Sequence, residues 1–412
     1  MKKKKVNKKE LVKSVVIIVL ALGILILLGR ILKYQNFEND YTDWIGIQEK
    51  ENDYYTGKIQ EGFAKAVEPE SIIISTEGKS TCIFKSERRY EDTLTKMKNA
   101  LNNAKTELMG EVTADEWVSY AGKGGIHLRF IYDLTEENID EIGIRKDTFA
   151  KETESFCEIL VSVEDKVLLL GTRDGKGYKF SFEYEKLETL DDFNIENGTC
   201  EYRKGMGFGP VPVGEYKLQV LTPAVPSVYK DNLRIDKITE SMENLLPVYG
   251  YDVTTVRRYS DYNNALIFAD ATSSIKFTYD GTVEYSAVNK ENGVEVGLLS
   301  TVRGVHGIIY KTLKTFGVNV EGDMGIRLTN IRTEGEEIWF SFEYTYNGIT
   351  IIEETPAFTA VVSNGRMTKL YMRVRGYNEK GGETAENKVS GNGNIHLIYR
   401  GETEKKGIWT EL

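Results

Sequence analysis

The sequence contains few of the residues that give a protein covalent cross-links or metal sites. Among 412 residues there are three cysteines, three histidines and seven prolines. Three cysteines cannot form a dense disulfide scaffold. The low proline content and 41% hydrophobic residues exclude a disordered or collagen-like chain. The chain therefore builds packed cores, and its length predicts about two to three domains.

Metal-ligand motifs are also absent from the sequence, and an S-x-x-K match at residues 227–230 lies at the linker with no K-T-G strand to accompany it. His127, His306 and His396 lie far apart, without an H-x-x-x-H or Cys-x-x-Cys pattern. His127 and His396 fall in strand-like runs and are expected to be ordinary strand histidines. A sortase-like site at Cys82 would need a histidine before the cysteine, and none precedes it. We expect no catalytic, cofactor-binding or metal residues, no cofactor, and a protein that is not an enzyme.

The three cysteines, Cys82, Cys157 and Cys200, all lie in the first half of the chain. One disulfide with a free thiol fits this spacing, and so do three reduced, buried cysteines.

The net charge of −10 is the sum of two opposite parts. Residues 1–33 carry +8, which leaves −18 for the remaining 379 residues. Binding to nucleic acid requires a basic surface that neutralises phosphates. The acidic balance of the main part therefore excludes a nucleic-acid partner.

An apolar run follows the basic N-terminus. Residues 14–29 carry no charge, and seven lysines precede them. With its flanks (14–32) this run has the length of a membrane-spanning helix, and the lysines predict a cytoplasmic N-terminus with the bulk of the chain outside the cell membrane. A cleaved signal peptide is the alternative, but no A-x-A-like site follows. If a partner helix packs on this span, its small residues Ala21, Gly23 and Gly29 are the expected contacts.

The rest of the chain predicts an α+β fold of antiparallel sheets with a few packed helices. Apolar spacing predicts helices over residues 90–104, 235–245 and 300–316, and alternation predicts strands in both halves. Turn pairs at 174–175, 280–281, 347–348 and 364–365 predict hairpins. Four of the seven prolines fall within 205–226 and mark a linker. The predicted organisation is a tail (1–13), an anchor (14–32), a first domain (33–204), a linker (205–230) and a second region (231–412).

The pentapeptide Phe-Ser-Phe-Glu-Tyr occurs twice, at residues 180–184 and 340–344. Coincidence between aromatic-rich strands explains this repeat, and so does duplication of one unit.

Four segments carry a resemblance to a known family. They are a strand and helix (69–101), a strand running into a short helix (125–139), a hairpin centred on Asp-Gly (267–288) and a C-terminal run of strands with two Asn-Gly turns (340–377). With the basic tail and single span, they resemble the YycH/YycI (WalH/WalI) regulators of Gram-positive bacteria. The last segment is similar to the YycI-type, PepSY-like ending.

This resemblance implies a non-catalytic, membrane-anchored protein that modulates a sensor histidine kinase of the cell envelope through membrane and extracytoplasmic contacts. Its implied partners are the kinase and a second YycH/YycI-type protein. Two alternatives are a PepSY-like binding or inhibitory module for an extracytoplasmic protease and an envelope enzyme acting on wall polymer with an unrecognised carboxylate pair.

Overall fold

The computed structural model describes residues 62–411 with short gaps, and residues 58–412 form one compact unit. The gaps are residues 77–78, 86, 88, 136–138, 146–147, 150–154, 185–199, 203–210, 213–223, 229–243, 262–264, 297–300, 353–354, 385, 388–394 and 401–405. The predicted tail (1–13) and anchor (14–32) lie outside the described residues. Within these residues no helix combines the length and the apolar character needed to cross a bilayer.

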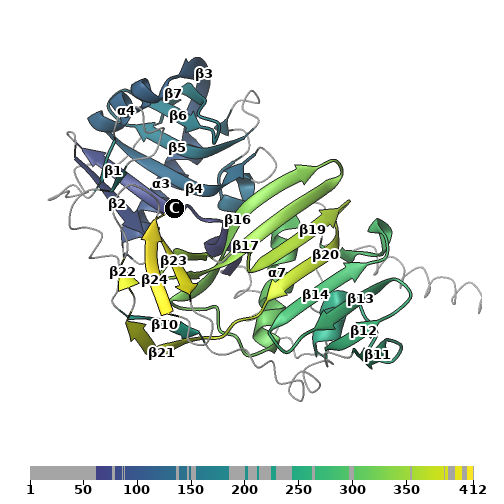
Figure 1. Cartoon of the computed structure of the whole chain (residues 1–412). Coiled ribbons are helices and arrows are strands. Elements are labelled where there is room, and N and C mark those ends of the chain that lie inside the picture. The colour runs from purple at the N-terminus through teal and green to yellow at the C-terminus, as the bar shows by residue number, and fades with distance from the viewer. Residues whose placement is uncertain are drawn as a thin grey trace, which may run out of the picture. The chain divides into compact units, whose positions relative to one another are not determined.

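The first half of the described chain forms a nine-stranded antiparallel sheet in the order β3-β7-β6-β5-β4-β1-β2-β8-β9 (Figure 1). Its strands are β1 (Ser71–Thr76), β2 (Lys79–Phe84), β3 (Lys105–Val112), β4 (Gly124–Leu134), β5 (Phe156–Ser162), β6 (Val167–Gly171), β7 (Gly177–Glu183), β8 (Cys200–Glu201) and β9 (Val211–Pro212).

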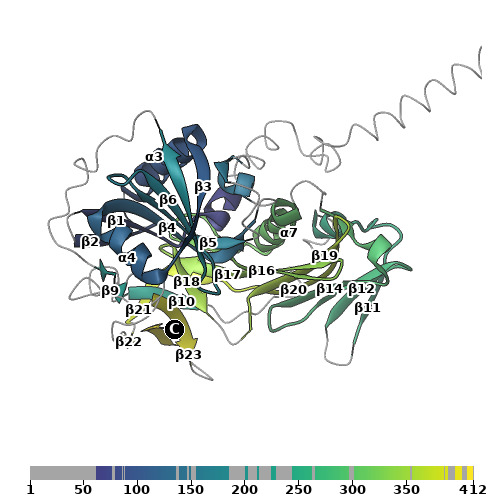
Figure 2. The same cartoon turned by 90° about the horizontal axis from the view of Figure 1, so that it is seen from above.

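Helices cover both faces of this sheet. Helix α3 (Arg89–Asn103) buries Leu94 and Met97 in the main core, to which Ile159 of β5 also belongs. Helix α4 (Ala114–Lys123) packs Trp117 with Leu160, the next residue of β5. Because successive strand residues point to opposite faces, the two helices lie on opposite sides of the sheet (Figure 2). A short 3-10 helix, η1 (Ile139–Ile142), follows β4.

The second half forms another sheet, in which strands distant in sequence become neighbours. Its order begins β11-β12-β13-β14-β20-β19-β17-β18, while β15 pairs with β20 and β16 pairs with β17. Its strands are β11 (Arg257–Ser260), β12 (Leu266–Ala269), β13 (Ser273–Phe277), β14 (Thr282–Ala287), β15 (Val294–Glu295), β16 (Met324–Glu334), β17 (Glu337–Tyr346), β18 (Ile349–Ile352), β19 (Phe358–Ser363) and β20 (Arg366–Arg373). These pairs are antiparallel.

Helix α7 (Thr301–Thr315) packs on this second sheet with the predicted apolar face. Val302, Val305, Ile309 and Leu313 are all buried. Gly304 is required by close packing, because a Cβ atom there would lie 2.1 Å from the carbonyl oxygen of residue 296. The 3-10 helices η4 (Leu246–Tyr249) and η5 (Lys290–Asn292) flank the same half.

The parallel strand pairs of the described structure involve its C-terminal strands. Strand β23 (Ile395–Arg400) runs parallel to β18, and β22 (Glu386–Asn387) runs parallel to β24 (Lys406–Glu411). Strands β23 and β24 pair antiparallel, as do β10 (Ala224–Val228) and β21 (Tyr377–Thr384).

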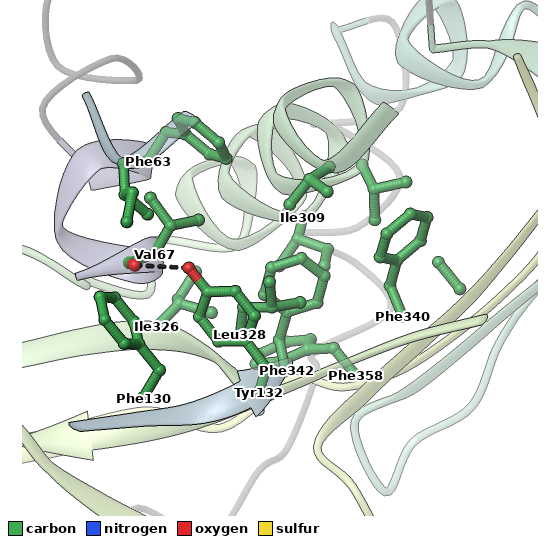
Figure 3. Close-up of a cluster of buried hydrophobic side chains, with 14 of the residues drawn as sticks. Phe63, Val67, Phe130, Tyr132, Ile309, Ile326, Leu328, Phe340, Phe342 and Phe358 are labelled. Carbon is green, nitrogen blue, oxygen red and sulfur yellow. Dashed lines mark hydrogen bonds between the residues drawn. The ribbon is translucent and has the colours of Figure 1, made fainter. Parts of the chain in front are cut away.

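One hydrophobic core includes residues from both halves (Figure 3). Phe63 and Val67 from the helical residues 62–67 meet Tyr132 of β4, Leu328 of β16 and Ile309 of α7. The hydroxyl of Tyr132 donates a 2.6 Å hydrogen bond to the carbonyl oxygen of Val67. The core is therefore continuous across the predicted linker. The domain boundaries at 204 and 231 stay predictions.

The predicted α+β fold of antiparallel sheets with few helices is confirmed for the described residues, while the PepSY-like ending stays a prediction. The Asn-Gly turns are confirmed in detail, since Asn347, Gly348, Asn364 and Gly365 all have positive φ angles, as the tightest hairpin turns require.

The end of the helix predicted over 235–245 is described. Residues 244–245 are α-helical, η4 follows with Pro247 in its first turn, and Gly250 with φ 77° terminates it. Most of that predicted helix lies outside the described residues. Strand β3 and helix α4 were not predicted, although Thr113 and Glu116 form a capping box at the start of α4.

Candidate functional site

A polar cavity of about 340 Å³ lies beside the start of β16. Residues from both halves of the chain line it, and no single element forms it. The lining residues are Gly62, Lys65, Lys85, Glu91, His306, Tyr310, Val320, Glu321, Gly322, Asp323, Met324, Gly325, Ile326, Arg327, Thr345, Asn347 and Gly348.

Arg327 is the most deeply buried charge of this cavity. Its side chain is 1% exposed, and its Nε and Nη1 atoms have no hydrogen-bond partner among the described residues. Strand β16 places it between the core residues Ile326 and Leu328. A guanidinium stays charged in proteins, and a buried charge normally needs a counter-charge or acceptors. Arg327 is therefore an exception that calls for an explanation.

Lys85 follows β2 and is half-buried beside the cavity. Its Nζ atom donates hydrogen bonds to Glu68 Oε2 at 2.5 Å and to the carbonyl oxygen of Lys65 at 2.9 Å. Burial and the nearby Arg327 together lower the pKa of Lys85 to about 8, against the opposing effect of Glu68. Lys85 is itself a cation and cannot be the counter-charge of Arg327, and the Glu68 carboxylate is already paired with Lys85.

His306 forms the helical wall of the cavity. It is 1% exposed, and burial lowers its pKa to about 4, so that the imidazole is neutral at pH 7. Its ring stacks on Tyr310 at a centroid distance of 6.3 Å and meets the edge of Phe63 at 5.7 Å. The Nδ1 atom has no hydrogen-bond partner within the described part of the chain. His306 thus offers a second buried polar atom in the lining of the same cavity.

The carboxylates of the cavity lie toward its rim. Glu91 and Asp323 are exposed, and Glu321 is half-buried. Glu321 accepts hydrogen bonds from the Tyr310 hydroxyl at 2.6 Å and from Lys314 Nζ at 3.3 Å. Among the lining residues, the fully buried charge is therefore that of Arg327, while these carboxylates stand nearer to solvent. This arrangement suits the binding of a small polar molecule with an anionic group.

A second polar cluster lies within the first sheet and is fully paired. His127 on β4 is hydrogen bonded through Nε2 to Glu158 at 2.6 Å and through Nδ1 to Tyr202 at 2.8 Å. Arg129 Nε donates to the same carboxylate at 3.2 Å. Burial opposes the charged form of Glu158, but Arg129 and His127 outweigh it and hold its pKa below the ordinary value. The expectation that His127 is an ordinary strand histidine is confirmed. The His396 side chain lies outside the described part.

The two cysteines with described side chains in this sheet carry no reactive thiol. Cys82 and Cys157 are buried and form no disulfide, and burial raises the pKa of each thiol to about 12. A thiol that stays protonated is a poor nucleophile. For these two residues the structure agrees with the reduced, buried alternative. The Cys200 side chain lies outside the described part of the chain.

The small residues Ala21, Gly23 and Gly29, expected to contact a partner helix, all lie outside the described residues, so this prediction stays open. The cavity residues Arg327, Lys85 and His306 were not singled out as a site. Their types gave no signal, because the cavity joins residue 85 to residues 306 and 327 only after the two halves pack together. One local pattern is visible in the sequence. Ile326, Arg327 and Leu328 alternate as in a strand, so the arginine is predicted to face away from the two apolar side chains.

Comparisons with known proteins give one informative result for the fold. No protein-family model matches the sequence, and no curated protein matches it. The structure is similar to the crystal structure of YycH from Bacillus subtilis, with a TM-score of 0.51 and 12% identical residues. The likeness covers 84% of this chain and 94% of that chain. The chain therefore has a YycH-like fold.

Proposed function

We propose that this protein is a non-catalytic regulator of a sensor histidine kinase of the cell envelope. The observation that carries the proposal is the YycH-like fold, which extends over 84% of the chain. The resemblance to the YycH/YycI regulators drawn from the sequence supports the same role. A second protein of the YycH/YycI type is the further proposed partner.

The proposal includes a single membrane span at residues 14–32, with the lysine-rich tail in the cytoplasm and the rest of the chain outside. The charge asymmetry of +8 before residue 34 and −18 after it supports this orientation. The anchor would hold the folded part beside the extracytoplasmic region of the kinase. Its small residues Ala21, Gly23 and Gly29 would face the membrane helices of the partner.

A regulator of this kind must bind two states of the kinase unequally. A ligand with equal affinity for both states shifts no equilibrium, however tightly it binds. A tenfold preference for one state corresponds to about 1.4 kcal/mol. Contacts in the membrane and outside it each contribute to this difference.

The test is reconstitution of the full chain with the envelope sensor kinase of the bacterium that encodes it. Kinase autophosphorylation is measured in vesicles with and without the protein, and cross-linking is followed by identification of the captured membrane protein. We expect a change in the autophosphorylation rate and a cross-link to the kinase. An unchanged rate together with no cross-link would refute the proposed function.

Two variants separate the contributions of the anchor. In the first, residues 14–32 are replaced by an unrelated membrane span, which keeps the topology but removes the proposed helix contacts. In the second, Ala21, Gly23 and Gly29 are changed to leucine. We expect both to weaken regulation while the folded part stays in place. Full regulation by both variants would assign the contact to the extracytoplasmic part alone.

A second candidate function is a module that accepts a peptide strand from an extracytoplasmic protease. One observation favours it: β11 stands at the end of the second sheet, and all four of its residues, Arg257 to Ser260, are exposed. An open edge can pair with an extended segment of another protein. Changing Tyr259 to proline would remove the edge as a hydrogen-bonding surface. Regulation of the kinase that survives this change, together with lost protease binding, would favour the second function.

A further inference from the structure

The cavity beside β16 presents a charge without a partner. Arg327 Nε and Nη1 are buried and make no hydrogen bond to any described residue. Lys85 and Glu68 neutralise each other at 2.5 Å. Glu343 lies opposite Arg327 in the β16–β17 ladder, but burial raises its pKa to about 8 and favours its protonated form. Among the residues that line the cavity, Arg327 is therefore the buried charge without a hydrogen-bond partner for Nε and Nη1 in the described part of the chain. A buried charged group left unpaired is strongly destabilising, so a native protein keeps such a group when something else supplies the counter-charge.

We propose that this cavity binds a small solute bearing an oxyanion, a carboxylate or a phosphate, whose oxygens accept hydrogen bonds from Arg327. The guanidinium is the side chain best suited to planar oxyanions. His306 Nδ1, also buried and without a described partner, provides a second polar contact. The proposal concerns ligand binding by this chain and does not rest on the kinase.

The cavity limits the size and character of the solute. A volume of about 340 Å³ falls at the lower end of small-molecule sites, which span roughly 300–1,000 Å³. A solute of the size of an amino acid or a small dicarboxylate fits this volume, whereas a polymer does not. The exposed carboxylates Glu91 and Asp323 at the rim disfavour a second anionic group near the entrance. They favour a neutral or cationic outer end.

The test measures thermal unfolding of the full chain in detergent micelles at constant ionic strength. Inorganic phosphate, acetate, succinate and glutamate are titrated separately, with chloride as the reference anion. A ligand that binds only the folded state raises the Tm in proportion to the logarithm of its concentration above Kd. We expect such a rise for at least one oxyanion and none for chloride. The four anions distinguish free phosphate from carboxylate solutes.

The variant Arg327→Met removes the charge and keeps most of the side-chain volume. We expect it to unfold at a higher temperature than the wild type without ligand, because an unpaired buried charge is lost, and to show no rise with any anion. The matched control is Arg332→Met on the same strand, where the arginine is exposed and paired with Glu334 at 3.2 Å. This control is expected to keep the full response.

A second variant, Val320→Phe, keeps Arg327 and fills the cavity with a larger side chain. It is expected to lose the response to the anion, which tests the proposal even if the arginine variant does not fold. The proposal is overturned if no oxyanion raises the Tm of the wild type, or if Arg327→Met responds as the wild type does. It is also overturned if Arg327→Met folds but has a much lower Tm than the wild type, since that would reveal an internal partner of the arginine. The result of the kinase assay is independent of all these outcomes, so a failure of ligand binding is distinguishable from a failure of the proposed function.

Discussion

The same five residues, Phe-Ser-Phe-Glu-Tyr, form part of a strand in each half of the molecule, but their glutamates have different surroundings. In both copies the two phenylalanines are buried. Glu183, on β7 of the first sheet, is exposed. Glu343, on β17 of the second sheet, is only 6% exposed. Alternation along the strand thus fixes which side chains share a face, while the neighbouring elements decide whether that face is covered.

The difference extends to the buried charges of the two sheets. In the first sheet Glu158 is hydrogen bonded to His127 and Arg129. In the second sheet Glu343 accepts one hydrogen bond from the backbone N–H of Ala357, and burial raises its pKa to about 8. The first sheet therefore holds its buried carboxylate charged, and the second favours the protonated form of its carboxylate.

The strand order also differs between the two copies. Each pentapeptide strand pairs with the strand that follows a helix, β3 after α3 and β16 after α7. The other neighbour of β7 is β6, which precedes it, whereas β17 pairs on its other side with β19, which follows it. The topology therefore does not repeat with the pentapeptide.

The largest expected effect concerns the paired network of the first sheet. Changing Glu158 to alanine removes the buried carboxylate that pairs with His127 and with the half-buried Arg129, and we expect a loss of about 3–5 kcal/mol in the free energy of unfolding at pH 7. Because the pKa of Glu158 is lowered in the folded state, its stabilisation is present above the unfolded value and disappears as the pH falls through the folded value. Denaturant unfolding at pH 7 and at pH 3 measures both.

The variant Glu158→Gln serves as the control for this network, since it keeps a hydrogen-bond acceptor of the same shape. It should lose less stability than the alanine variant. A loss below about 1 kcal/mol in Glu158→Ala would mean that water replaces the carboxylate, because exposed ion pairs contribute only about that much.

The second prediction tests the close packing of Gly348 against Lys85, where the two halves meet. Gly348 has a φ of +75°, and a Cβ atom there would lie 2.4 Å from the Cβ atom of Lys85. Gly335 has a φ of +62° but open space around it. Both alanine variants carry the backbone strain of a positive φ, about 1–3 kcal/mol. We expect Gly348→Ala to cost about 1–2 kcal/mol more than Gly335→Ala, as overpacking does. Equal losses in thermal unfolding would show that Lys85 moves away freely.

The third effect compares the two glutamates of the pentapeptide directly. Because the folded pKa of Glu343 is about 8 against an ordinary 4.5, the folded state holds a proton that the unfolded state releases, and stability falls between these pH values. Glu343→Gln removes this dependence. We expect the variant to gain about 1–3 kcal/mol relative to the wild type between pH 5 and pH 9.

Glu183→Gln is the matched change in the first copy. Since Glu183 is exposed, we expect an effect within about 0.5 kcal/mol. Denaturant unfolding at pH 5, 7 and 9 measures both variants. If the difference in unfolding free energy between Glu343→Gln and the wild type is the same at all three pH values, the burial of that carboxylate in solution is contradicted.

Much of the local structure could be predicted from the sequence. The hairpins at Asn347-Gly348 and Asn364-Gly365 follow from residues that tolerate positive φ, and helices α3 and α7 follow from the spacing of their apolar residues. Strand β3 could not be predicted in the same way, because its residues before Val112 alternate between exposed and half-buried positions. Its side chains therefore carry little hydrophobic signal.

The cavity could not be predicted, for a different reason. Nothing in the sequence around Arg327 distinguishes it from Arg332 on the same strand, yet one is buried and the other exposed. The difference arises because the start of β16 packs against residues of the first half, such as Lys85, while its end does not line the cavity. Burial of this kind depends on contacts between residues more than two hundred positions apart.

The pairing of β14 with β20 has a consequence for the order in which the chain can fold. Thr282 pairs with Arg373 in this ladder, so the sheet cannot close until the chain has been made almost to its C-terminal strands. Pairings between distant segments form slowly, and an unpaired strand edge exposed in the meantime invites association with other chains. During synthesis β14 therefore waits with one edge open until β20 has been made.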